Sequence, residues 1–150
     1  MKSPNSKSAD LRRYGECVCF NLRWMSRLVT QFYERRLGGN GVRFSQTPIL
    51  ARLAAGPAKM AELSEWLVLE RTALLRTLQP LIDEGYVARA PAARGRGWEL
   101  SVTPGGLRLL AELQPEWEKV QEEVVAAIGG ERWRDFLAAA ESAAVRLGRN

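Results

Sequence analysis

The chain has 150 residues, of which 46% are hydrophobic and 26% are charged, a composition typical of one folded domain and not of a disordered segment. Its net charge of +5 favours a polyanionic partner, whereas the lack of histidine removes the commonest general base and metal ligand. No apolar run approaches the roughly 18 residues that a membrane helix needs, and residues 1–13 lack the apolar core of a signal peptide. We therefore expect a cytoplasmic protein that is not an enzyme and that has neither a metal site nor a cofactor.

The first predicted helix covers residues 16–37 and carries two apolar stripes. The members of each stripe recur at helical spacing; one stripe is Val18, Leu22, Met25, Val29 and Phe32, and the other is Phe20, Trp24 and Leu28. A helix that is apolar over so wide an arc is covered from two sides, for instance by its own domain and by a partner subunit. A second, short helix is predicted over residues 45–55.

Residues 60–103 carry the most specific pattern in the chain. A short helix with one apolar face is predicted over 60–67, and a longer helix with an apolar stripe follows over 71–83 after a tight turn. Two short strands, 86–89 and 98–102, then flank a loop rich in glycine and arginine. This order predicts a winged helix-turn-helix, whose second helix enters the major groove of DNA while the hairpin, or wing, lies beside it.

Two more helices are predicted after the second strand. Thr103 and Pro104 suit the N-cap and the first position of a helix that runs to residue 128. Two glycines end it, and a last helix follows over 131–147. A single domain has little use for so long a helix unless a second chain covers its additional apolar stripe. We therefore expect one mainly α-helical domain over residues 1–150. Its parts are dimerisation helices at 16–37 and 104–148 and a winged helix-turn-helix module at 45–103.

At these residues the chain resembles the MarR family of bacterial winged helix-turn-helix regulators. The motifs of the family occur in order over most of residues 16–128. They are the runs Cys19–Arg23, Val29–Tyr33, Ala61–Leu63, Leu69–Leu74, Leu78–Leu81, Glu84–Val87 and Val102–Gly106, with Arg96 in the wing. The resemblance implies a homodimeric transcriptional regulator that binds double-stranded DNA. It also implies that helices from both ends of the chain form the dimer interface.

The chain departs from the family pattern at positions that bear on DNA recognition. Val68 stands where a turn glycine is usual, and a β-branched residue with positive φ is strained, so we expect a reshaped turn. Ala73 and Leu75 replace small hydroxyl residues that are common on the groove-facing side of the second helix. Arg94 stands where the wing usually has an aspartate that pairs with the arginine now at Arg96. These departures bear on the target sequence more than on the fold.

The charges of the predicted DNA-binding module are balanced in number but unevenly placed. Residues 59–103 hold six Lys/Arg and six Asp/Glu. Basic side chains gather in the first half of the second helix and on or near the wing, whereas acidic ones lie at the far end of that helix. The side chains predicted to contact bases and phosphates are Arg71, Thr72, Leu75 and Arg76. Those predicted to contact phosphate or the narrow minor groove from the wing are Arg94 and Arg96.

We expect a homodimeric repressor of a near-palindromic operator, whose two recognition helices enter successive major grooves roughly 34 Å apart. A small ligand or thiol oxidation would release it from DNA. The alternative is a dimeric winged-helix protein-interaction module that no longer binds DNA, favoured by Val68, Ala73, Leu75 and the neutral charge of the module. A thiol enzyme is disfavoured because no histidine is present to serve as its base.

Two cysteines are the chemical groups that could sense an oxidant. Cys17 and Cys19 lie two residues apart on a predicted helix, so their side chains point to roughly opposite sides and a bond between them is implausible. They also supply too few ligands for zinc. A resemblance to the organic-peroxide-sensing branch of the family implies a reactive thiol at Cys19 and a tyrosine partner at Tyr33, but Phe44 stands where a second tyrosine is expected. We favour the interpretation of both cysteines as small buried hydrophobic residues.

The resemblance further implies an effector pocket between the dimer helices and the winged module. The candidate residues for this pocket on the first helix are Phe20, Arg23, Trp24 and Arg27. The two arginines would pair with an anionic aromatic effector. Tryptophans at helical spacing are more often core or interface residues than ligand contacts, so we favour a packing role for the five tryptophans of the chain.

Overall fold

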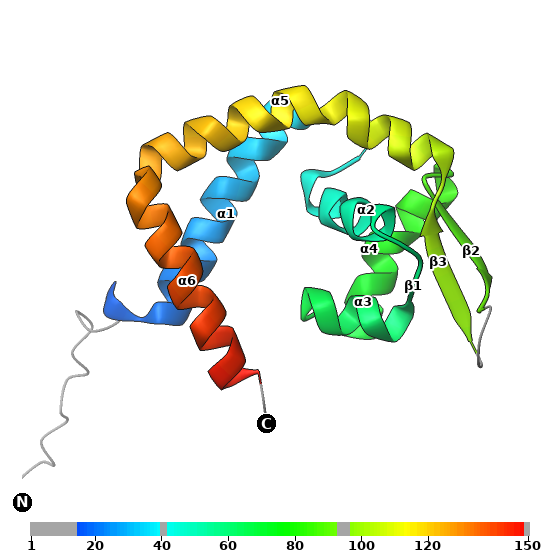
Figure 1. The fold of residues 1–150 in the computed structure, drawn as a ribbon, viewed down its shortest axis with the longest axis horizontal. Helices are drawn as coiled ribbons and strands as arrows, with labels where there is room; N and C mark the ends of the chain where they lie inside the picture. Colours follow the sequence, from blue (N-terminus) through cyan, green and yellow to red (C-terminus); the bar gives the residue numbers. More distant parts are fainter. Residues whose placement is uncertain (1–14, 40–41, 93–96, 149–150) are drawn as a thin grey trace, which may run out of the picture.

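The computed structural model describes residues 15–39, 42–92 and 97–148. In chain order its elements are α1 (Val18–Leu37), η2 (Phe44–Gln46), α2 (Thr47–Ala54), β1 (Ala58–Lys59), α3 (Met60–Leu67), α4 (Arg71–Asp83), β2 (Val87–Pro91), β3 (Trp98–Val102), α5 (Pro104–Ile128) and α6 (Gly130–Leu147). Figure 1 shows α5 arching across the molecule, with α1 and α6 on one side below it and α2, α3, α4 and the strands on the other. The mainly α-helical winged helix-turn-helix predicted from the sequence is confirmed.

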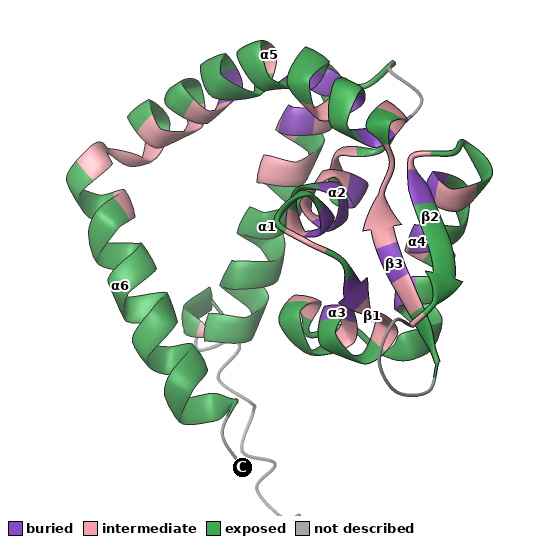
Figure 2. Cartoon of the chain, turned by 45° about the vertical axis from the view of Figure 1, so that its right-hand side comes forward, coloured by how far each residue is buried: buried purple, intermediate pink, exposed green. Residues whose placement is uncertain are grey.

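The winged module is built around one hydrophobic core. Helices α2, α3 and α4 turn their apolar stripes inward, and Figure 2 shows buried positions concentrated on these helices and on the strands. The most deeply buried members are Ile49, Leu50, Leu53, Leu63, Leu74, Leu78, Leu81 and Leu100. Because three of these leucines come from α4, the inner face of that helix is fixed by packing, and its opposite face is left toward solvent.

The three strands form an antiparallel sheet in the order β1-β3-β2. In β1, which sequence patterning did not predict, buried Ala58 lies opposite buried Leu100 of β3. Strand β2 extends to Pro91, beyond the predicted end at residue 89, and pairs with β3 as far as Trp98. The paired hairpin therefore reaches further from the core than the sequence indicated.

The turn between α3 and α4 keeps the geometry that usually requires glycine. Val68 has φ of 52° and ψ of 44°, the left-handed conformation, and its side chain is 90% exposed. The backbone N–H of Leu69 donates to the carbonyl of Ser64 at 3.0 Å, which closes the end of α3. The expectation of a reshaped turn is therefore wrong, because the surrounding hydrogen bonds hold the valine in the conformation of the glycine it replaces.

The start of α5 is fixed against the end of the helix-turn-helix, as the threonine and proline there predicted. The hydroxyl of Thr103 accepts a hydrogen bond from the N–H of Gly106 at 3.1 Å and donates to the carbonyl of Gly85 at 2.7 Å. Gly106 lies so close to the backbone of Tyr86 that a Cβ atom there would be 2.5 Å from the carbonyl oxygen of that residue. This junction sets the direction in which α5 leaves the winged module.

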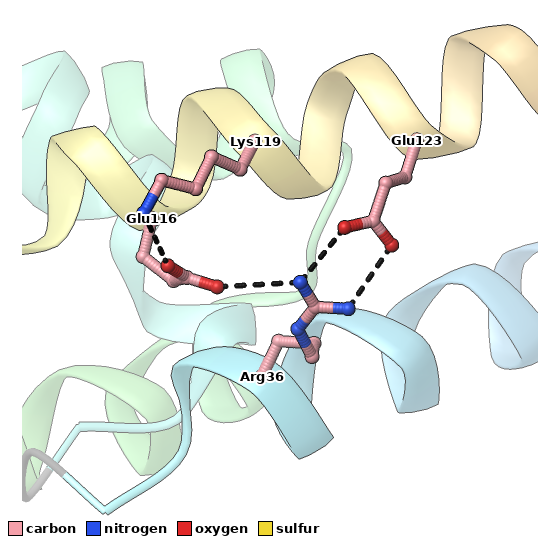
Figure 3. A network of polar contacts seen from close by, with 4 residues as sticks. All are labelled: Arg36, Glu116, Lys119 and Glu123. Carbon is pink, nitrogen blue, oxygen red and sulfur yellow. Dashed lines mark hydrogen bonds and ion pairs between the residues drawn. The ribbon is translucent and has the colours of Figure 1, made fainter.

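Helix α1 packs on the middle of α5 through a second, smaller core. Its buried members are Tyr33, Leu37 and Val120. Figure 3 shows the polar contacts beside it, where Arg36 donates to both carboxylate oxygens of Glu123, at 2.8 and 3.0 Å, and lies 3.4 Å from Glu116. A hydrogen bond from Lys119 and the charge of Arg36 lower the pKa of the Glu116 carboxyl. Arg36 thereby joins α1 to two carboxylates of α5 that lie about two helical turns apart.

The first half of α1 and all of α6 lie outside both cores. Helix α6 has no buried residue, and Figure 2 shows it exposed along almost its whole length. Large apolar side chains are exposed on both helices; they are Val18, Phe20, Leu22, Trp24, Met25, Leu28, Phe136, Leu137, Val145 and Leu147. Among the helices of the described ranges, none combines the length and the apolarity of a bilayer span.

Candidate nucleic-acid interface and neighbouring pocket

The outer face of α4 presents the side chains that the sequence predicted for DNA contact. Arg71, Thr72, Leu75 and Arg76 are all exposed, because the buried leucines occupy the opposite side of the helix. Leu75 keeps 41% of its surface accessible. Neither arginine forms an ion pair or a side-chain hydrogen bond with a residue in the part of the chain that the structure describes. This face therefore offers two unneutralised cations beside one hydroxyl and one aliphatic group.

A buried amide holds α4 in place from behind. Gln46 of η2 is 5% exposed, and its Nε2 donates to the backbone carbonyl of Thr77 at 3.1 Å. Its Oε1 accepts from the N–H of Arg43 at 2.8 Å. Both ends of the side chain are satisfied, which removes the cost of burying it. Sequence reasoning missed Gln46, since a glutamine in a short helix carries no sign that it will be buried.

The wing is described only where its strands pair. Arg94 and Arg96, predicted to contact DNA, lie outside the described residues. Within the paired region the guanidinium of Arg89 on β2 lies over the ring of Trp98 on β3, with its central carbon 4.3 Å from the ring centroid. Both side chains are exposed. The sequence placed Arg89 near the wing but gave no indication of this aromatic partner.

The two cysteines lie at the start of α1. Cys17 is the N-cap residue in an extended conformation, and Cys19 lies in the first turn of the helix. Cys19 is exposed and Cys17 is intermediate in burial, so the interpretation of both as buried hydrophobic residues is wrong for this chain. Cys17 has extended backbone angles and precedes the helix, whereas the sequence predicted that the helix already began at residue 16.

Within one chain the structure does not bring Tyr33 to Cys19. The two are 14 residues apart on the same helix, which corresponds to about 21 Å along the axis at 1.5 Å per residue. The hydroxyl of Tyr33 instead donates to Oε1 of Gln121 on α5, and its ring stacks on that of Phe44. Burial raises the pKa of Tyr33 above its ordinary value.

A pocket of about 570 Å³ lies where the winged module meets α1 and α5. Its lining comes from α1, η2, α2, α3 and α5, and it is mainly apolar. The lining residues are Leu37, Phe44, Thr47, Pro48, Ala51, Ala54, Trp66, Leu110, Leu113, Gln114 and Trp117. Thr47 and Gln114 supply its polar groups, and no charged side chain is among the described residues that line it.

The pocket is thus not made from the residues that the sequence suggested. Phe20, Arg23, Trp24 and Arg27 all lie exposed on the first half of α1 and do not line it. Two tryptophans do line it, Trp66 and Trp117, although a packing role was expected for all five. The pocket depends on how separate helices meet, so no local sequence pattern could have identified its members.

Comparisons with known proteins give matches in fold. No protein-family model matches the sequence, and no curated protein matches it. The transcriptional regulator MOSR of M. tuberculosis, solved in complex with DNA, is 29% identical, with a TM-score of 0.74 over 89% of this chain and 99% of that one. A mutant MarR from E. coli, complexed with operator DNA, is 17% identical, with a TM-score of 0.79 over 90% of this chain and 99% of that one. CouR, a transcriptional repressor bound to a 23-mer DNA duplex, is also 17% identical, with a TM-score of 0.78 over 90% and 97%.

Proposed function

We propose that this chain, which has the winged helix-turn-helix fold of MarR-family transcriptional regulators, is a sequence-specific repressor that binds double-stranded DNA. The observation that carries the proposal is the outer face of α4. Arg71 and Arg76 are exposed and without an anionic partner among the described residues. Thr72 and Leu75 lie beside them, and they are able to contact a base edge and a thymine methyl group respectively.

The repressor acts as a homodimer in this proposal. The exposed apolar faces of α1 and α6 support this, because monomeric proteins seldom leave so many large apolar side chains in water. A second copy of the chain would cover these faces. A two-fold axis between the copies would present two α4 helices to successive major grooves, about 34 Å apart. The operator is accordingly near-palindromic. Arg94 and Arg96 of each wing would contact phosphate or the minor groove next to the major groove that α4 enters.

A small aromatic molecule is the proposed effector, and the pocket between the winged module and α5 is its site. The apolar lining favours a neutral ligand over an anionic one, because a buried carboxylate without a cationic partner would be costly. This modifies the anionic effector expected from Arg23 and Arg27. Oxidation of Cys19 is a second proposed route of release, since its thiol lies between Val18 and Phe20 on the part of α1 that a second copy would cover.

One observation favours a different function. The DNA-facing surface has Ala73 and Leu75 where hydroxyl groups are usual, and Val68 exposes an isopropyl group at the adjoining turn. A winged-helix module with this apolar surface would bind a protein. In that case the dimer would show no salt-dependent affinity for any duplex.

The deciding experiment is selection of duplexes from a random library, followed by fluorescence anisotropy of the selected duplex against salt. We expect a two-fold-symmetric motif and an affinity that falls steeply with salt, since each neutralised phosphate adds about 0.9 to the logarithmic slope. Arg71→Ala should weaken binding and lower that slope. Arg108→Ala, an exposed arginine on α5, is the matched control and should change neither. No enriched motif at low salt would reject the proposal in favour of the protein-binding module.

A further inference from the structure

The paired part of the wing carries a second basic element that is separate from its tip. Arg89 lies on β2 and Trp98 on β3, and the register places Arg89 opposite Leu100 and Trp98 opposite Pro91. Residues directly opposite in an antiparallel pair share a face of the sheet, so these four side chains lie on one face. Leu100 is buried, whereas Trp98 is 50% exposed. The face that packs in the core thus continues outward into solvent, where Arg89 covers Trp98.

This face of the hairpin is the one that packs in the core of the winged module. Val87, two residues before Arg89 on the same face, is buried in the core together with Leu74 and Leu78 of α4. Figure 1 shows β2 and β3 side by side along the right-hand edge of the winged module, below the start of α5. At about 3.3 Å per strand residue, Arg89 projects roughly 7 Å beyond Val87. It therefore lies beyond the buried part of the hairpin, on the face that the hairpin turns toward the core.

The stacked geometry leaves the charge of Arg89 available. A guanidinium that lies over an indole ring keeps N–H groups that can bind a phosphate in bidentate fashion. Arg89 forms no ion pair with any residue in the described ranges. Glu99, the nearest acidic residue in β3, lies opposite Ala90 and so belongs to the other face. The ring of Trp98 also restricts the rotamers of the arginine before any ligand arrives.

We propose that Arg89 and Trp98 form a phosphate-binding platform on the inner face of the wing, which holds the sugar-phosphate backbone beside the groove that α4 enters. The proposal rests on the proposed DNA-binding function and adds a contact that is independent of the wing tip. In it Arg89 binds the phosphate, and Trp98 is a positioning residue that orients the guanidinium. Because a phosphate carries no sequence information, the platform adds affinity equally for all duplexes and fixes the register of the protein on them.

The test uses the full-length protein and the selected duplex, with anisotropy measured over a range of salt concentrations. Arg89→Gln removes the charge but keeps a planar side chain of similar length. We expect it to lower the logarithmic salt slope by about 0.9 for each copy of the chain that binds, and to weaken binding on the order of fivefold per copy at physiological salt. The loss should be the same for a scrambled duplex. Arg108→Ala serves as the control that removes an exposed arginine elsewhere.

The positioning role of Trp98 is tested by a double-mutant cycle. Trp98→Ala should weaken DNA binding in the wild-type background and have no further effect when Arg89→Gln is present, since its contribution acts through the arginine. Trp98→Phe should retain part of the affinity, because a phenyl ring still supports the cation. DNA binding should change the tryptophan emission of the wild-type protein, because Trp98 lies at the proposed contact. This change should disappear in Trp98→Phe, because the remaining tryptophans lie on helices outside the wing.

Failure of the platform can be distinguished from failure of the whole function. If Arg71→Ala lowers the salt slope but Arg89→Gln leaves the slope and the affinity at wild-type values, the platform is wrong and DNA binding stands. If Trp98→Ala lowers only the melting temperature, the stack is a brace for the hairpin and the inference is overturned. If the wild-type protein binds no duplex, the proposed function fails first, and the platform fails with it.

Discussion

The aromatic rings of Tyr33 and Phe44 stack with their centroids 4.3 Å apart and their planes 21° from parallel. Tyr33 belongs to α1, which packs on α5, whereas Phe44 begins η2, whose Gln46 is bonded to the backbone of α4. Phe44 also lines the pocket. The long helices are therefore linked to the recognition helix through the ring stack, the backbone of η2 and the hydrogen bond from Gln46 to Thr77.

Removing the hydroxyl of Tyr33 is expected to alter stability in a pH-dependent way. At neutral pH, Tyr33→Phe should cost about 1 kcal/mol, because the hydrogen bond to Gln121 is lost while the ring stack is kept. Burial raises the pKa of Tyr33 in the folded state. The shift stabilises the folded state fully at pH values below about 10, which is the pKa of a tyrosine in the unfolded chain. This stabilisation is lost as the pH rises through the higher pKa that Tyr33 has in the folded state. Melting temperatures of both proteins between pH 7 and 11.5 should show a steeper alkaline decline for the wild type; parallel curves would contradict this.

The left-handed valine in the helix-turn-helix turn is expected to be a source of strain. Val68→Gly should raise the free energy of unfolding by about 0.5–1 kcal/mol, since left-handed backbone costs a β-branched residue more than glycine loses in entropy. The exposed valine side chain contributes little packing. Urea unfolding at constant m-value measures the change, and Val68→Ala is the control, which keeps a Cβ atom and should gain less. A destabilised glycine variant would show that the turn is not strained.

Two neighbouring glycines of α5 should respond oppositely to alanine. Gly106→Ala should destabilise the fold by about 1–3 kcal/mol, because its Cβ would lie 2.5 Å from the Tyr86 oxygen and 2.7 Å from a methyl of Val102. At Gly105 the nearest atom would be 3.4 Å away, so Gly105→Ala should be neutral or stabilising through its helix propensity. Equal effects of the two substitutions on chemical unfolding would contradict the close packing of Gly106 against Tyr86.

The exposed face of α1 provides the test of the homodimer. Leu28→Glu should convert the dimer to a monomer, because a charge would enter the apolar interface that we propose there. Leu75→Glu is matched to it, since the two leucines are 44% and 41% exposed, but Leu75 lies on the DNA-facing side of α4. That variant should stay dimeric and lose DNA binding. Light scattering coupled to gel filtration measures the mass of each, and a wild-type monomer at micromolar concentration would exclude the dimer.

The pocket is expected to prefer a neutral aromatic ligand. A naphthol should quench the emission of Trp66 and Trp117, whereas the naphthoate anion of similar size should bind at least tenfold more weakly, for want of a cation in the lining. Ala51→Phe places a ring in the pocket and should abolish the quenching. Ala88→Phe, which adds the same ring to an exposed position on β2, should leave it unchanged. Tighter binding of the anion would mean that a charged group outside the described lining takes part.

The secondary structure could be predicted closely where apolar periodicity was strong. Residues 60–67, 71–83 and 104–128 were expected as helices and are α3, α4 and α5. Strand β1 could not be predicted, because two residues show no alternation and their pairing with β3 is non-local. The outward direction of Arg71 and Arg76 followed from the leucine stripe on the other side of α4, although their contact with DNA remains a prediction.

The features that could not be predicted depend on contacts between distant segments. The burial of Gln46, the pocket lining and the stacking of Arg89 on Trp98 each join residues more than eight positions apart, so no local pattern indicates them. The exposure of Cys19 was missed for a related reason. Its burial was expected from the usual behaviour of free cysteines, whereas the described chain supplies nothing that covers the start of α1.

The unbroken length of α5 has a mechanical consequence. Its 25 residues follow a curved path about 37 Å long, with the winged module fixed to one end by Thr103 and Gly106 and the apolar surface of α6 at the other. A rotation of about 10° about the α6 end would carry the far end through roughly 6 Å, close to the pitch of an α-helix. On such a lever, a small change where α1 and α5 meet would become a displacement of the winged module by about one helical turn.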